Sequence, residues 1–448
     1  MQTALIFLYF CNMKREQRGI SKTVWIITIA FFALLFVQTV WHLVPMEPLA
    51  NDWQRVPKPQ LSYANFRDCT FQNELNEYLK DQYAFREFLT RLFNQYRYSF
   101  YNKSCSDFFV PGKDHWMYYS PGVYDYYGLE APKFFKSNEE LMQFYDELLV
   151  KLCELRSILK NEFDIELLTY VGPDKPFIYP EHLPKKKGDT SMLRAASYFS
   201  EIAETASFPH INMTPWFKAM ADTSSRLLFM PMESHWKYSA VYGYDSLLRL
   251  MDGLNDFGIP KLKINGISEQ KYIDRQGDEK TINLLFKVKN TTPKYTVDVS
   301  VVADSTKHKP KVLFVGDSFF FALAETLPVR EIFFYYELWF YNDKVFKGFE
   351  AQEYKLSEIN KLRSILNVDY VVLYSVGYNW YKEIHPFVND ALQSIKDPKQ
   401  VEVALMMNQI ENNSEWMHSI SEEAEKNGIS IEKQLEFDAQ KYLDHQEK

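Results

Sequence analysis

A serine and a histidine in this chain lie in contexts that suit acyl transfer. Ser318 follows an apolar run through a Gly-Asp pair, and His235 follows a shorter apolar run with Glu233 two residues before it. A serine hydroxyl becomes nucleophilic when a histidine removes its proton, and a carboxylate usually orients that histidine. The three residue types therefore predict Ser318 as the nucleophile, His235 as the base and Glu233 as the orienting acid.

Each segment also has a simpler interpretation. A Gly-Asp-Ser sequence before a helix is a common N-terminal cap, and a Glu-x-His sequence is often only a hydrogen-bonded surface pair. Chemistry is favoured because both segments are expected to follow strands of one sheet. The backbone N–H of Ser318, at the start of a helix, is then a natural oxyanion donor.

The elements expected to position these segments are apolar strands separated by helical patterns. Strand-like runs occupy residues 165–171, 227–230, 311–315, 332–336 and 368–374, and helical periodicity covers 137–161 and 356–366. This alternation predicts an α/β fold, a mostly parallel sheet with helices on both faces. Because ligands bind at the carboxyl ends of such strands, we expect His235 and Ser318 at one edge of the sheet.

A membrane anchor is expected before this domain. Residues 23–44 carry no Asp, Glu, Lys or Arg, and at about 1.5 Å per residue they can span a bilayer core of roughly 30 Å. Basic residues are denser before this segment than after it, which predicts a cytoplasmic N-terminus at residues 1–22. A cleaved signal peptide is the rival interpretation, and translation could start at Met1 or Met13.

The remaining chain is expected to form a linker, one main domain and a tail. Residues 45–65 are polar and contain proline, as linkers do, and residues 66–400 form the main domain. A β insertion is expected near 256–309, and residues 401–448 form a charged helical tail.

Composition argues against several classes of function. The net charge is −8 and no basic stripe is present, so nucleic-acid binding is not expected. The four cysteines form no Cys-x-x-Cys pair and no nucleotide motif is present, so neither a metal nor a cofactor is expected. Outside the cytoplasm Cys69 and Cys105 could form a disulfide, and unpaired thiols are the equal alternative.

The two segments resemble the signature blocks of a known family, the SGNH-hydrolase-like proteins of the alginate O-acetyltransferase group. In that group an Asp-x-His-Trp block precedes a Gly-Asp-Ser-Phe block. Here ESHW at 233–236 precedes GDSF at 316–319, and further similar blocks extend the resemblance over residues 60–395. The sequence departs from the family at Glu233, where the family has Asp, and at 376–379, where a Glu-Arg pair is absent.

The resemblance implies an SGNH-hydrolase-like, flavodoxin-like domain preceded by one transmembrane helix. It implies a place at the cytoplasmic (inner) membrane with the main domain in the periplasm. The implied reaction is acetyl transfer to hydroxyl groups of an exported polysaccharide through acetyl-Ser318, with a multi-spanning membrane acyltransferase as acetyl donor.

The resemblance also suggests further site residues. By position, Asn379 is a candidate second oxyanion donor, and Lys175 and Trp236 are candidates for substrate binding. An ion pair that holds its loop is the alternative role for Lys175. Two alternatives to the transferase stay open: an acetyl esterase with the same triad, and a non-catalytic glycan-binding or scaffold subunit.

Overall fold

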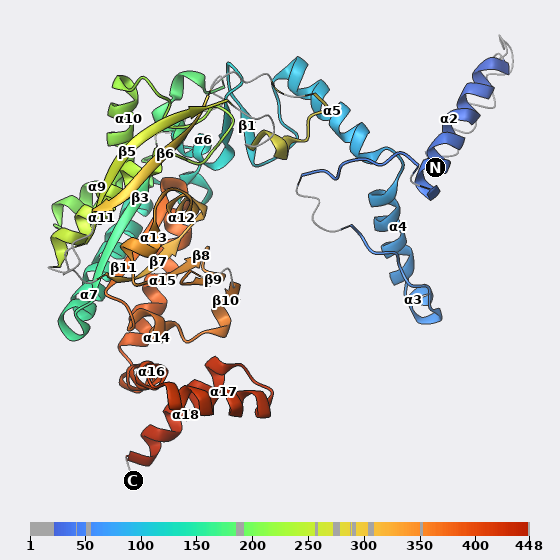
Figure 1. The fold of residues 1–448 in the computed structure, drawn as a ribbon. Helices are drawn as coiled ribbons and strands as arrows, with labels where there is room; N and C mark the ends of the chain where they lie inside the picture. The colour runs from blue at the N-terminus through green and yellow to red at the C-terminus, as the bar shows by residue number, and fades with distance from the viewer. Residues whose placement is uncertain are drawn as a thin grey trace. The chain divides into compact units, whose positions relative to one another are not determined.

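The computed structural model describes residues 22–41, 43–50, 55–184, 192–255, 259–271, 278–286, 288, 293–302, 309–349 and 353–446 (Figure 1). The chain divides into two compact units. The smaller comprises Met1–Cys105 with Glu279–Lys287, and the larger comprises Ser106–Asp278 with Val288–Lys448.

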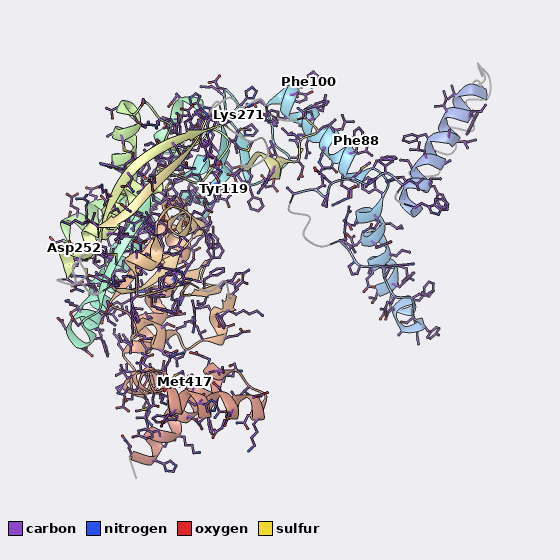
Figure 2. All side chains as sticks on the ribbon, viewed as in Figure 1. Phe88, Phe100, Tyr119, Asp252, Lys271 and Met417 are labelled. Carbon is purple, nitrogen blue, oxygen red and sulfur yellow. The ribbon has the colours of Figure 1, made fainter. Side chains whose placement is uncertain are left out.

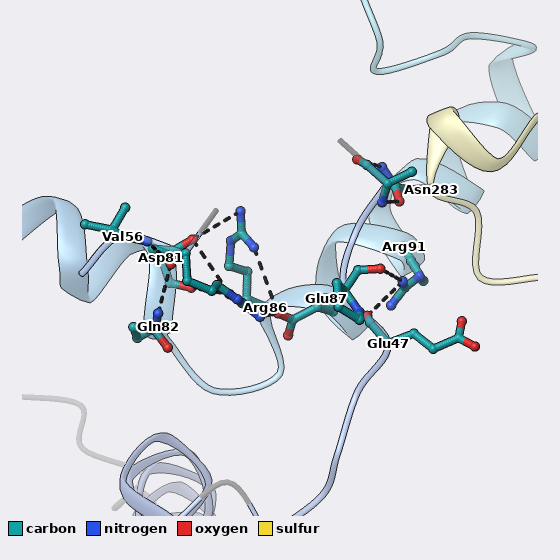
Figure 3. A network of polar contacts seen from close by, with 11 residues as sticks. Glu47, Val56, Asp81, Gln82, Arg86, Glu87, Arg91 and Asn283 are labelled. Carbon is teal, nitrogen blue, oxygen red and sulfur yellow. Dashed lines mark hydrogen bonds and ion pairs between the residues drawn. The ribbon is translucent and has the colours of Figure 1, made fainter. Parts of the chain in front are cut away.

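The smaller unit contains mainly helices. They are α2 (Lys22–Trp41), α3 (Tyr63–Arg67), α4 (Thr70–Gln82) and α5 (Arg86–Tyr101). A polar network surrounds the turn between α4 and α5, where the Asp81 carboxylate accepts the Val56 N–H at 3.0 Å (Figure 3). Arg55 donates to the Asp81 carbonyl and pairs with Glu87. Both carboxylates are buried, and these partners offset the cost of burying them.

Residues 279–286 pack within the same unit. The Asn94 side chain donates to the Ile282 carbonyl at 2.9 Å, and the Asn283 side chain accepts the Ala50 N–H at 2.7 Å. These hydrogen bonds therefore hold Ile282 and Asn283 in the smaller unit, although in sequence the two residues lie between two strands of the larger unit.

Two sequence expectations concern the smaller unit. Within the part of the chain that the structure describes, no helix is both long enough and apolar enough to cross a membrane. The anchor predicted at 23–44 is not confirmed. Of the two alternatives for Cys69 and Cys105, the structure shows unpaired thiols, since both residues are free and exposed.

A seven-stranded mixed sheet forms the centre of the larger unit (Figure 1), with the order β10-β9-β8-β7-β11-β3-β4. The strands are β3 (Glu166–Gly172), β4 (His210–Asn212), β7 (Lys311–Gly316), β8 (Tyr335–Phe340), β9 (Lys344–Lys347), β10 (Glu353–Lys355) and β11 (Tyr370–Val376). Strands β8, β7, β11, β3 and β4 pair in parallel, and β9 and β10 continue the sheet with antiparallel pairing. The expected α/β class is confirmed, with a mixed sheet.

Apolar side chains alternate between two cores, one on each face of this sheet. On β7, Val312 and Phe314 belong to the first core, and Leu313 and Val315 to the second. Helices α10 (Met213–Thr223), α11 (Ala240–Leu254) and α12 (Phe321–Thr326) contribute to the first core. Helices α7 (Asn138–Phe163), α9 (Ala195–Thr205), α14 (Lys361–Ile365) and α15 (Trp380–Ile395) contribute to the second. Both faces are covered, which leaves the strand ends to form a site.

Shorter elements complete the larger unit. They are β1 (Phe109–Pro111), β2 (Met117–Tyr119), α6 (Ser120–Tyr126), η1 (Ala131–Lys133), α8 (Lys175–Ile178), η2 (Pro180–His182), β5 (Lys261–Gln270), β6 (Lys294–Val302), η4 (Ser318–Phe320), α13 (Val329–Ile332), η5 (Leu356–Glu358) and η6 (Gly377–Asn379). The short helix η3 (Asp278–Ile282) begins at Asp278, which is the last residue of the segment Ser106–Asp278 of the larger unit. Figure 2 shows Tyr119, which ends β2, among the side chains of this unit.

Several boundaries differ from those expected. Residues 227–230 form no strand, because β4 takes the sheet edge beside β3, and the apolar side chains there are buried in a loop. Strand β8 begins at Tyr335 rather than at residue 332, since α13 precedes it. The expected insertion forms the antiparallel pair β5–β6, and residues 256–258, 272–277, 287, 289–292 and 303–308 lie outside the described part.

The C-terminal segment folds as three helices with a small core of their own. They are α16 (Pro398–Glu411), α17 (Ser414–Asn427) and α18 (Ile431–Gln446). Val403, Met407, Ile420 and Leu435 are buried among them. The sequence predicted a charged helical tail, and the structure adds that its helices pack around a small core.

Candidate active site

Ser318 stands directly after the carboxyl end of β7. Gly316 ends β7 beside the backbone of β11, where a β-carbon would lie 1.7 Å from the Tyr374 carbonyl oxygen, so that only glycine fits. Asp317 then caps the turn η4, because its carboxylate accepts the Phe319 N–H at 3.1 Å. This local geometry leaves the half-buried Ser318 side chain at the rim of the sheet.

Buried aromatic residues hold the loop that carries His235. The indole N–H of Trp236 donates to the Phe319 carbonyl at 3.2 Å, and the Tyr244 hydroxyl donates to the same carbonyl at 2.9 Å. These bonds fasten the histidine loop to the serine turn, and His235 Nε2 lies 2.8 Å from Ser318 Oγ. The expectation that Trp236 contacts substrate is wrong, because its side chain is fully buried.

Lys175 also holds the loop that carries His235. Its Nζ lies within hydrogen-bond distance of four backbone carbonyl oxygens, those of Met117 (2.7 Å), Met230 (2.8 Å), Pro231 (2.9 Å) and Glu233 (2.8 Å), which share its three protons. The side chain is 2% exposed. The structure thus does not present Lys175 to a substrate, and the residue holds its surroundings through carbonyls rather than through an ion pair.

The Nδ1 side of His235 faces a serine. Ser234 Oγ lies 3.3 Å from His235 Nδ1 and donates to Asp278 Oδ2 at 2.5 Å. The structure does not join Glu233 to His235: within the described residues no hydrogen bond links the two side chains, and Glu233 Oε2 is buried without a partner. The predicted orienting acid is therefore near the histidine in sequence but is not bonded to it.

Asp317 organises the opposite side of the serine turn. Its Oδ2 accepts from the Ser375 hydroxyl (3.0 Å), the Val376 N–H (2.9 Å) and the Asn379 side-chain amide (3.2 Å). Asn379 is thus placed close to Ser318 through Asp317, and one of its amide protons is used in this bond. The Ser318 N–H, at the first residue of η4, is the other predicted oxyanion donor.

A tyrosine approaches the same serine from the end of β8. Tyr341 Oη lies 3.4 Å from Ser318 Oγ, at the long end of hydrogen bonding. Burial raises the pKa of Tyr341 to about 12, although the Ser318 hydroxyl and N–H favour the ionised form. The tyrosine is therefore a neutral hydroxyl beside both groups that an acyl carbonyl must reach.

The electrostatics suit His235 as a base. Burial lowers the pKa of His235, and the negative charges of Asp278 and Asp317 oppose this shift. A histidine with a lowered pKa is neutral near pH 7, and its Nε2 can then accept a proton. Burial raises the pKa of Glu233 and lowers the pKa of Lys175 to about 7.

Sequence reasoning missed three residues of this arrangement. Ser234 was part of the quoted block but was given no role, Tyr341 follows a strand expected to end at residue 336, and Asp278 lies in the expected insertion. Only Ser234 carried a local signal, namely adjacency to His235, because the strand that precedes Tyr341 extends to Phe340 only in the structure. Nothing in the spacing of Asp278 indicated its position.

A second serine–histidine pair exists at the edge strand β4. Ser200 Oγ lies 2.8 Å from His210 Nε2, and Thr169 Oγ1 lies 2.8 Å from His210 Nδ1, beside a cavity of about 620 Å³. Ser200 Oγ also donates to the Ala196 carbonyl at 2.7 Å, and burial lowers the pKa of His210 to about 4. The serine proton is thus committed to a carbonyl and the histidine is a weak base, so this pair does not share the chemistry of Ser318.

Taken together, the residues at the end of β7 can support nucleophilic attack by a serine with a histidine as general base. Among the described residues no group of His, Cys, Asp and Glu is arranged to hold a metal ion. The geometry is that of proton transfer between Ser318 and His235, with hydrogen-bond donors nearby for a developing oxyanion.

Similarity of this chain to known proteins is found among solved structures. No family model and no curated protein matches the chain. Among solved structures, the O-acetyltransferase domain of Pseudomonas putida AlgJ is similar, with 15% identity over 61% of this chain and 91% of that chain and a TM-score of 0.37. Pseudomonas aeruginosa AlgX gives 12% identity, 63% and 67% coverage and a TM-score of 0.36. Bacillus cereus PatB1 gives 10% identity, 61% and 97% coverage and a TM-score of 0.37. These neighbours include the group that the sequence blocks resemble, but at such low TM-scores the likeness carries no argument about activity.

Proposed function

We propose that the protein is an O-acetyltransferase that moves acetyl groups onto hydroxyls of an exported polysaccharide through an acetyl-Ser318 intermediate. The single observation that carries the proposal is the 2.8 Å contact between His235 Nε2 and Ser318 Oγ. The order of the two signature blocks in the sequence supports the acetyl group and the polysaccharide as substrates.

The chemistry has two balanced half-reactions. Ser318 Oγ attacks the acetyl carbonyl while His235 Nε2 takes the hydroxyl proton, and the bond to the donor breaks as that proton passes to the leaving oxygen. An acceptor hydroxyl then attacks acetyl-Ser318 and gives its proton to His235, which returns it to Ser318 Oγ. The Ser318 N–H and the Asn379 amide are the groups available to the carbonyl oxygen.

Incubation with p-nitrophenyl acetate and intact mass spectrometry test the first half-reaction. We expect one acetyl group on the wild-type chain, located at Ser318 by peptide mapping, and none on Ser318→Ala. Ser200→Ala is the matched control, because it removes the serine of the other histidine pair, and it is expected to label as the wild type does. Labelling that survives in Ser318→Ala would overturn the proposal.

Product analysis separates transfer from hydrolysis. With an oligosaccharide present, a transferase forms the acetylated sugar, whereas an esterase with the same triad releases acetate at the same rate with or without the sugar. A non-catalytic subunit gives neither product. The non-catalytic alternative is included because, within the described residues, no hydrogen bond joins the Glu233 side chain to His235.

We also propose that residues 23–44 anchor the domain at the outer side of the cytoplasmic membrane, near a membrane acyltransferase that supplies the acetyl group. The uncharged composition of the segment and the basic residues before it support this. Membrane fractionation of the full chain and of a chain beginning at residue 45 is the test. Recovery of both chains in the soluble fraction would contradict it.

A further inference from the structure

We propose that Asp278, acting through the Ser234 hydroxyl, is the group that orients His235, in the place that the sequence assigns to Glu233. This role deepens the proposed function, because it concerns the serine and histidine on which that function rests. It makes Asp278 and Ser234 positioning residues rather than catalytic residues.

The hydrogen-bond geometry gives the direction of each bond. Asp278 Oδ2 lies 2.6 Å from the Ser234 N–H nitrogen and 2.5 Å from Ser234 Oγ. An ionised carboxylate only accepts hydrogen bonds, so Ser234 must donate its single hydroxyl proton to Asp278. The oxygen of Ser234 then has lone pairs left, and it can only accept from His235 Nδ1, which lies 3.3 Å away.

This direction fixes the tautomer of His235. Nδ1 carries the proton toward Ser234, and Nε2 therefore presents a lone pair to Ser318, 2.8 Å away. A general base needs this tautomer. Ser234 thus transmits the preference of Asp278 to His235 across one hydroxyl.

The charges around His235 agree with this assignment. Burial lowers the pKa of His235, and among the opposing charges Asp278 ranks first, before Asp317; Lys237 lowers the pKa further and Glu325 raises it. Tyr341, a neutral hydroxyl, faces the same site through Ser318. Glu233 makes no hydrogen bond to the His235 side chain within the described residues, and its buried Oε2 has no partner there.

The position of Asp278 explains how a carboxylate from the insertion reaches the site. The Asp278 N–H donates to the Met232 carbonyl at 2.9 Å, so backbone and side chain of this residue both bind the 232–234 segment. Asp278 is therefore held against the histidine loop on two sides. That attachment keeps the carboxylate at a fixed distance from Ser234.

The first test measures the pKa of His235 directly. In protein labelled with ¹⁵N-histidine, the His235 resonance is identified by its loss in His235→Gln, and its pKa is followed by pH titration. We expect Asp278→Asn to lower the pKa of His235, because a negative charge that favours the imidazolium is lost. Glu233→Gln is expected to change it less, and Asp222→Asn, an exposed carboxylate on α10, is the matched control.

The reactivity of Ser318 gives a second readout that needs no acetyl donor. Phenylmethanesulfonyl fluoride sulfonylates activated serines, and its rate on the full chain reports the base. We expect Asp278→Asn and Ser234→Ala each to slow this reaction by about 10- to 100-fold, part of the usual contribution of a general base. The combined variant is expected to slow it no further, because the two residues act in one path.

Ser234→Ala is expected to disturb the fold less than Asp278→Asn, because it keeps the backbone N–H that binds Asp278. The proposal is overturned if Glu233→Gln slows sulfonylation and lowers the His235 pKa more than Asp278→Asn does, or if Ser234→Ala changes neither. Absence of acetyl transfer in the wild type would contradict the proposed function but leave this test intact, because sulfonylation and titration do not involve an acetyl group.

Discussion

Replacing Lys175 by methionine should loosen the histidine loop and destabilise the fold. The ammonium has three protons and lies within 2.9 Å of four backbone carbonyls. Methionine has a similar length and no proton to donate, so the variant removes the bonds while largely keeping the volume. The Lys175 side chain is 2% exposed, and water has little access to replace it.

The size of the effect follows from which carbonyls keep another donor. The Met230 carbonyl also accepts the Glu233 N–H, and the Pro231 carbonyl also accepts the Met117 N–H. The Met117 and Glu233 carbonyls lose most. At about 1–3 kcal/mol for each buried acceptor left without its partner, we expect a loss of roughly 2–6 kcal/mol in the free energy of unfolding.

Urea unfolding, followed by tyrosine and tryptophan fluorescence, measures this loss at a pH below the Lys175 pKa of about 7, where the ammonium is charged. Sulfonylation of Ser318 should slow as well, because the Glu233 carbonyl lies two residues before His235. Lys218→Met, at an exposed site on α10, is the control and should change neither value. A Lys175→Met protein that keeps its urea midpoint and its labelling rate would refute this reasoning.

Three further outcomes are expected. Gly316→Ala should destabilise the fold by about 3 kcal/mol or more, because the new β-carbon would lie 1.7 Å from a backbone carbonyl oxygen. Gly253→Ala, with nothing within 4 Å of the new atom, should instead stabilise α11 by about 0.5–1 kcal/mol in urea unfolding; a similar loss in both variants would contradict the steric argument. Tyr341→Phe should slow sulfonylation of Ser318 without changing the urea midpoint, since it removes only a hydroxyl 3.4 Å from Oγ; an unchanged rate would show that this hydroxyl has no role. The rate of sulfonylation should fall as the pH drops through the lowered pKa of His235, because the protonated ring cannot accept a proton; the acid limb should therefore lie below the ordinary histidine pKa of about 6.5, and a limb above it would contradict burial as the cause.

The sequence by itself determined the class of the fold and the pair that could react. Apolar runs of strand length separated by helical periodicity indicated an α/β sheet, because both faces of such strands must be covered. The Gly-Asp-Ser sequence after an apolar run indicated either a helix cap or a nucleophile that follows a strand. These are local properties, since periodicity and turn chemistry depend on neighbours along the chain.

Only the tertiary structure decided which carboxylate is hydrogen-bonded to the residue beside the histidine. Glu233 is two residues from His235, but its backbone is held by Lys175, and no hydrogen bond links its side chain to the ring within the described residues. Asp278 is 44 residues from Ser234 in the chain and binds it twice. Separation along the sequence does not encode this contact, because it depends on how the insertion folds back onto the loop.

The same distinction applies to Lys175 and Trp236. Their positions beside a motif suggested contact with a substrate, yet both side chains are buried and bind backbone carbonyls. A lysine and a tryptophan have the same local sequence signal whether they face a ligand or the interior. Burial depends on how the whole unit packs. Because both side chains are buried, they do not contact a ligand but bind backbone carbonyls that hold His235 near Ser318.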